Sequence, residues 1–122
     1  MATWVSAVTL LVADQDRSID FYVNKLGWEL RTDAEMWPGA RWVEVGPAGS
    51  QAGVVLTRAT DFNKEPGGDA GFVMATDDVQ ALHAELTGRG VEVTEPKAEG
   101  WGTFITFSDP DGIQHIIGQH SH

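Results

Sequence analysis

Asp109-Pro110-Asp111-Gly112, set between residues 103–107 (TFITF) and 113–117 (IQHII), is the stretch that decides the fold. Both flanking runs are rich in strand-forming residues and the four residues between them are typical of a turn, so the stretch predicts a β-hairpin. Pro110 presets φ for the turn, and Gly112 tolerates a positive φ. With Ser108 opposite Ile113, one face of this hairpin is expected to carry Thr103, Ile105, Phe107, Gln114 and Ile116.

The composition bounds the class of protein. A chain of 122 residues is expected to form one domain with one sizeable core. Its formal charge of −10 argues against a nucleic-acid partner, which requires a basic face, and suits solubility or an attraction for cationic ligands. The absence of cysteine fits a reducing compartment. No run approaches the roughly 20 apolar residues of a spanning helix. We therefore expect a soluble, cytoplasmic protein with no membrane partner.

The first half of the chain follows the order βαβββ. Residues 4–12 are predicted to form a strand, and a helical pattern of apolar residues then ends at Gly27, a typical C-cap. Three short runs, 28–32, 41–45 and 53–57, are expected to be strands because they are apolar or alternate, and glycine and proline separate them.

The second half repeats this order. After a polar connector at about 60–69, the residues predict a strand at 70–76, a helix that starts near Asp77-Asp78 and stops at Gly88 or Gly90, a strand at 91–94, a break at 96–100 and the C-terminal hairpin. A tail is expected at 119–122. The halves align at an offset of 63, which places Asp14 on Asp77 and Gly27 on Gly90. An internal repeat of this length indicates two modules, about 1–59 and about 70–118, because one half-buried four-stranded sheet needs a partner. The predicted class is α+β, with two tandem βαβββ modules forming a curved, eight-stranded, half-open barrel-like sheet.

Three phrases carry a family resemblance. They are residues 16–27 (DRSIDFYVNKLG), 77–79 (DDV) and Trp101-Gly102 leading to the turn at 109–112. Together they resemble the vicinal oxygen chelate superfamily, which includes glyoxalase I, extradiol dioxygenases, and fosfomycin and bleomycin resistance proteins. The resemblance covers nearly the whole chain and implies the fold, but not one reaction, because this fold hosts many.

The resemblance also implies where a catalytic metal would bind. Metal enzymes of this superfamily carry His or Glu at four strand positions, which here are Ala7, Val55 or Leu56, Gly71 and Ile116. None of these side chains binds a metal, and a catalytic dication needs about three protein donors. We therefore expect neither a metal nor another cofactor, and glyoxalase-type or dioxygenase-type chemistry is disfavoured.

Residues two apart on a strand share a face with the lost ligand positions. By this rule and the family pattern, we expect an aromatic-lined groove that holds an organic small molecule. Trp37 and Trp101, in loops, are expected to stack on a planar or cationic ligand. The predicted ligand-binding residues are Thr9, Leu11, Trp37, Trp42, Glu44, Trp101 and Gln114. Each tryptophan can alternatively be interpreted as a core-packing residue, and Glu44 as a residue of the groove rim or of a dimer contact.

Three hypotheses follow for function. The leading one is a metal-independent binding protein, resembling the bleomycin resistance branch, that sequesters an aromatic or cationic ligand and so confers antibiotic resistance. The second is a metal-independent lyase or isomerase in which Glu44 transfers a proton. The third is a catalytically silent dimer whose groove serves assembly. A homodimer is expected in each case, because open sheet edges need cover.

Overall fold

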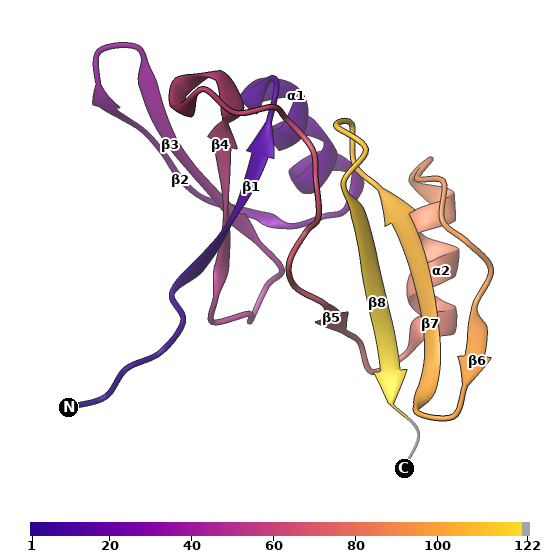
Figure 1. Cartoon of the computed structure of the whole chain (residues 1–122). Helices are drawn as coiled ribbons and strands as arrows, with labels where there is room; N and C mark the ends of the chain where they lie inside the picture. Colours follow the sequence, from indigo (N-terminus) through magenta and orange to yellow (C-terminus); the bar gives the residue numbers. More distant parts are fainter. Residues whose placement is uncertain (121–122) are drawn as a thin grey trace. The chain divides into compact units, whose positions relative to one another are not determined.

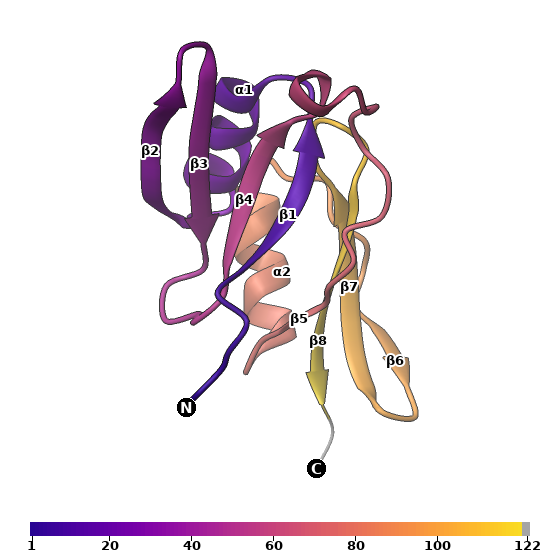
Figure 2. The same ribbon diagram turned by 60° about the vertical axis from the view of Figure 1, so that its left-hand side comes forward.

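The protein consists of two modules, each with its own sheet (Figures 1 and 2). The computed structural model describes residues 1–120, and their contacts divide into one unit, Met1–Gly68, and a second that begins at Asp69. The α+β class and the tandem modules are confirmed. The eight strands form two open four-stranded sheets, with four strands from each module.

The first module has the strand order β1-β4-β3-β2. Strand β1 runs parallel to β4, and the other neighbours are antiparallel. One helical segment follows β1 and covers one face of the sheet (Figure 1). It begins as α-helix α1 and continues as the π-helix η1, and a short 3-10 helix, η2, follows β4. The bounds are β1 Ala7–Val12, α1 Gln15–Ile19, η1 Asp20–Lys25, β2 Glu29–Trp37, β3 Ala40–Gly46, β4 Gly53–Arg58 and η2 Ala59–Phe62.

The second module has the corresponding order β5-β8-β7-β6. Strand β5 runs parallel to β8, β7 is antiparallel to both β8 and β6, and α2 lies against this sheet (Figure 1). The bounds are β5 Met74–Ala75, α2 Val79–Gly88, β6 Lys97–Glu99, β7 Gly102–Ser108 and β8 Gln114–His120.

The helical segments of the two modules differ in length by one residue. Asp14 caps α1 by accepting a hydrogen bond from the backbone of Arg17, and Asp78, within the predicted cap region Asp77-Asp78, caps α2 through the backbone of Ala81. Both segments end before a glycine with positive φ, Gly27 or Gly90. The first segment is therefore one residue longer than the second. The π-helical η1 accommodates this residue, since a π-turn is an α-turn with one residue inserted.

Each sheet has one helix-covered face and one helix-free face. In the first module, Arg41 on β3 bonds Asp16 on α1 at 3.0 Å, so Arg41 and the buried Val43 and Val45 point toward the helix. In the second module, Gln119 on β8 accepts a hydrogen bond from the backbone N–H of Val79, at the start of α2, at 2.7 Å. Residues of the opposite parity on these strands therefore form the helix-free faces.

The predicted register of the C-terminal hairpin is wrong by one residue. Ser108 pairs with Gln114 rather than Ile113, so Phe107 faces His115. Asp109 donates its N–H to the Ile113 carbonyl at 2.9 Å. The loop between the paired residues Asp109 and Ile113 is therefore 110–112. Its last residue, Gly112, has φ 80°, as in a hairpin closed by a glycine bulge. Gln114 and Ile116 consequently lie on the face opposite Ile105 and Phe107.

Other predicted boundaries also need correction. Residues 91–94 were expected to form a strand, but they make only the isolated bridge of Val93 with Phe107 and bonds of Thr94 to Thr106. The second strand of the module is instead β6, Lys97–Glu99, where a break was predicted. Of the expected tail at 119–122, residues 119 and 120 belong to β8, and 121–122 lie outside the described residues.

Candidate functional site

Glu44 and Trp42 lie on the helix-free face of the first module. Both have the opposite parity to Val43 on β3, and Glu44 is paired across the sheet with Val55 on β4. Val55 is paired in turn with Thr9 on β1. Four of the predicted residues, Thr9, Leu11, Trp42 and Glu44, therefore share this face, as the alternation of the strands predicted.

Aromatic side chains are exposed at the end of this face. Trp42 is 38% exposed and Trp37 is 51% exposed, so neither has the full burial that a core interpretation requires. Trp37 is the last residue of β2 and not part of a loop, and it pairs with Ala40, which is two residues from Trp42 on β3. The register thus places both indoles on the same face. Trp28, in contrast, packs on the buried Tyr22 with ring centroids 4.9 Å apart.

The Glu44 carboxylate is half-buried and lies across the backbone of Gly53 on β4. A methyl group on Gly53 would overlap this carboxylate. Among residues 1–120, Glu44 makes no hydrogen bond or ion pair. The acceptor capacity of this side chain is therefore available to a ligand or to water.

Trp101 lies on the helix-free face of the second module. Its ring covers Gly118 of β8, and it stacks on Phe104 with ring centroids 5.7 Å apart and an interplanar angle of 21°. The other predicted residue of this module, Gln114, is exposed on the same face of β8, two residues from Ile116. The two predicted residues of the module thus occupy one face.

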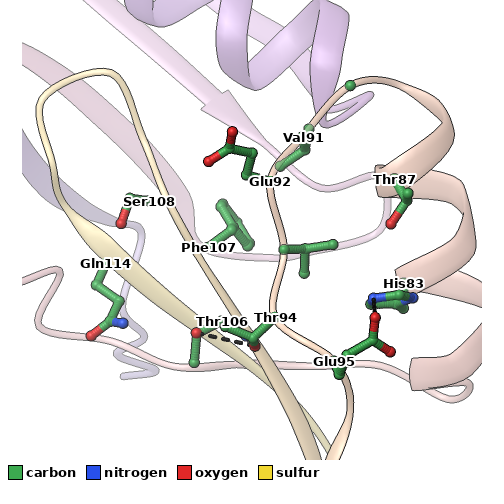
Figure 3. A pocket seen from close by; sticks show the side chains of 12 residues that line it. His83, Thr87, Val91, Glu92, Thr94, Glu95, Thr106, Phe107, Ser108 and Gln114 are labelled. Carbon is green, nitrogen blue, oxygen red and sulfur yellow. Dashed lines mark hydrogen bonds and ion pairs between the residues drawn. The ribbon is translucent and has the colours of Figure 1, made fainter.

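A surface hollow of about 700 Å³ lies where residues 90–95 pass between α2 and β7 (Figure 3). Sequence reasoning did not find it, because its lining comes from a segment read as a strand. His83 and Glu95 approach each other across it at 3.8 Å, and Thr94 bonds Thr106 at 3.2 Å. Gln114 is the one predicted residue in its lining.

The four family positions for a metal do not suit a metal. The register puts Ala7 and Val55 on the helix-free face of the first sheet, and the buried Leu56 on the other face, which decides between the two candidates on β4. Ile116 is on the helix-free face of the second sheet, and Gly71 precedes β5. Alkyl groups and a glycine hydrogen offer no donor. Within residues 1–120, no three His, Cys, Asp or Glu side chains cluster as a metal site would require.

His115, the histidine nearest to a metal position, faces the helix-covered side. It is fully buried against Phe72 and Phe107, with ring centroids 5.5 and 5.2 Å away. Burial lowers the pKa of this imidazole, and the negative charge of Asp109 opposes the shift. The side chain therefore packs as a core residue on the helix-covered face.

Fold and sequence together define the family. The family described as the Glyoxalase/Bleomycin resistance protein/Dioxygenase superfamily matches residues 4–115. The chain therefore belongs to this superfamily. Among residues 1–120, no helix is long and apolar enough to cross a membrane.

Three relatives illustrate the likeness. The uncharacterized protein YetH of Bacillus subtilis (strain 168) is 30% identical over 118 residues, which are 96% of this chain and 98% of that protein. The crystal structure of a superfamily member from Sphaerobacter thermophilus DSM 20745 is 36% identical with a TM-score of 0.89. TnmS3, described as an antibiotic binding protein from Streptomyces sp. CB03234, is 37% identical with a TM-score of 0.87. In both structural comparisons, 98% of each chain is covered.

Proposed function

We propose that this protein binds an aromatic or cationic organic molecule, without a metal, and protects the cell by sequestering it. One observation carries the proposal: exposed indoles and an unpartnered carboxylate share the helix-free face of the first module. The likeness to an antibiotic binding protein supports an antibiotic-like ligand. The alkyl side chains at the family's metal positions support binding that needs no metal.

The exposed aromatic area provides part of the binding free energy. Covering an indole such as Trp42 with a planar ligand contributes about 1.5–3 kcal/mol from apolar burial. A cationic ligand over the ring adds about 0.5–2 kcal/mol when it is desolvated. Two such contacts contribute roughly 3–10 kcal/mol before an association cost of roughly 4–15 kcal/mol, so the indoles supply one part of the affinity and other contacts on this face supply the rest.

The test is a titration with planar probes. Acridine, uncharged at pH 8, and the cation 9-aminoacridine are followed by calorimetry. We expect saturable binding, a loss of about tenfold or more in Trp42→Ala, and little change in Trp4→Ala. Trp4 is a suitable control because it is exposed and precedes β1. Failure of both probes to saturate the wild-type protein, or an equal loss in the two variants, contradicts the proposal.

The unpartnered carboxylate also favours a second candidate, a metal-independent enzyme in which Glu44 transfers a proton. The two functions differ in their response to Glu44→Gln. In an enzyme this substitution abolishes conversion of the bound molecule and leaves its affinity nearly intact, whereas in a sequestering protein it weakens cationic ligands and there is no conversion to lose. Mass spectrometry of the recovered ligand distinguishes them.

A homodimer is part of the proposal. Each sheet ends in two edge strands, and the helix-free faces expose large apolar side chains such as Trp37 and Ile116. Exposed edges and apolar surface of this kind are commonly covered by a second copy. In the third hypothesis this assembly is the whole function, and a dimer that binds neither acridine would favour it.

A further inference from the structure

Gly53 and Glu44 form a contact that only glycine permits. A Cβ atom built on Gly53 would lie 2.6 Å from Cδ and 2.8 Å from Cγ of Glu44, and closer still to Oε2. Gly53 is not among the glycines with positive φ, so its backbone does not require glycine. Glycine is needed at this position because any side chain would occupy the space that the Glu44 carboxylate fills.

A second glycine at the same end of the sheet repeats the arrangement with the opposite charge. A Cβ on Gly46 would lie 2.8 Å from Cζ of Arg31. The guanidinium is held there by the carbonyls of Pro47 and Ser50, at 2.9 and 2.7 Å. Gly46 shares the parity of Glu44, so the cation also lies on the helix-free face.

The two charged groups are neighbours but not partners. Glu44 pairs with Val55 in an antiparallel register, and continuing that register places Gly46 beside Gly53. Arg31 nevertheless donates its hydrogen bonds to backbone carbonyls, and no ion pair joins it to Glu44 within residues 1–120. The carboxylate is thus kept on the face without a direct ion pair to the nearby cation, and its oxygens keep their acceptor capacity.

We propose that Gly53 is a positioning residue for specificity: it holds the Glu44 carboxylate flat on the helix-free face, where it accepts a hydrogen bond from a ligand. The inference rests on the proposed binding function. Trp42 is two residues from Glu44 on the same face, roughly 7 Å along the strand, and the carboxylate leans farther from Trp42, toward the level of Gly46 and Gly53. A planar molecule of several fused rings that stacks on Trp42 and extends along this face brings an N–H at its far edge to the carboxylate. The ligand class is therefore a planar aromatic amine.

Three acridines separate hydrogen bonding from charge. At pH 8, 9-aminoacridine is a cation with N–H donors, 10-methylacridinium is a cation without them, and acridine has neither property. We expect wild-type protein to bind 9-aminoacridine about tenfold or more tightly than 10-methylacridinium, as a hydrogen bond to a charged group predicts. Binding of acridine, which depends on the indole, is expected to be weaker than either.

The decisive variant is Gly53→Ala. The new methyl group displaces the flexible end of Glu44 and leaves the strand backbone unstrained, so the variant is expected to fold, as circular dichroism verifies. We expect the preference for 9-aminoacridine over 10-methylacridinium to fall to about threefold or less, with acridine affinity unchanged. In a Glu44→Ala background, Gly53→Ala should have no further effect. Gly88→Ala is the matched control, because its Cβ meets nothing within 4 Å.

The outcomes distinguish this inference from the function on which it rests. No saturable binding of any acridine to wild-type protein overturns the proposed function. Binding without a preference for 9-aminoacridine, or a preference that survives Gly53→Ala, overturns the role of Gly53 and leaves the binding function standing. A crystal structure of Gly53→Ala with the carboxylate in its original place also overturns that role.

Discussion

Asp109 stabilises the turn that sets the register of the C-terminal hairpin. Its carboxylate accepts hydrogen bonds from the backbone N–H groups of Asp111 and Ile113, both at 2.9 Å. The residue is 6% exposed and Ile113 is fully buried, so water does not readily replace the lost acceptor. Asp109→Ala removes two bonds to a charged group and leaves a buried donor unpaired. We expect a loss of about 3 kcal/mol in the free energy of unfolding, or roughly 10 °C in melting temperature.

The matched variant is Asp109→Asn, which keeps the shape of the side chain and one acceptor oxygen but removes the negative charge. It is expected to lose only about 1 kcal/mol. Urea unfolding followed by circular dichroism gives the free energies, and amide hydrogen exchange at Ile113 reports on the turn. A loss below about 1 kcal/mol in Asp109→Ala, or equal losses in the two variants, would refute the reasoning.

Four further predictions follow from the structure. Since burial lowers the pKa of His115 in the folded state, an unfolded chain with a pKa near 6.5 binds the proton better. Stability should be unaffected by this group above about pH 7 and should fall by up to about 1.4 kcal/mol per unit as the pH drops below 6.5; a fall of the same slope in His115→Gln contradicts this. Gly118→Ala should displace the Trp101 ring, which would lie 2.7 Å from the new methyl carbon, and an unmoved indole N–H resonance would disprove the contact. Sedimentation should show a dimer, and a strictly monomeric species at micromolar concentration would exclude it. Elemental analysis of protein never exposed to chelator should find no stoichiometric divalent metal, and one equivalent per chain would refute metal independence.

Local chemistry in the sequence was enough to predict the elements that position the site. A strand alternates its side chains with a period of two, so the shared faces of Trp42 with Glu44 and of Thr9 with Leu11 follow from spacing alone. The tandem modules follow from the repeated order of elements and the glycines that end each helical segment. The ligand-binding roles of these residues remain predictions.

The predicted register of the C-terminal hairpin was wrong because a backbone hydrogen bond shortens the turn. The four residues from Asp109 were taken as the whole turn, but Asp109 still pairs with Ile113, and this extra position moves Gln114 and Ile116 to the other face. The strand predicted at 91–94 failed for a related reason. The strand propensity of those residues does not say whether a partner strand lies beside them, and β7 pairs with β6 instead.

The sequence by itself determined the fold class, the pairs of residues that share a face of a strand, and the loss of metal donors at the family positions. These depend on neighbours along the chain and on residue chemistry. Only the tertiary structure decided that Glu44 lies over Gly53 and that Trp101 lies over Gly118. Each of these contacts joins two strands, or a loop and a strand, that are distant in sequence, and the space that a glycine leaves is filled by whichever side chain the folded sheet brings to it.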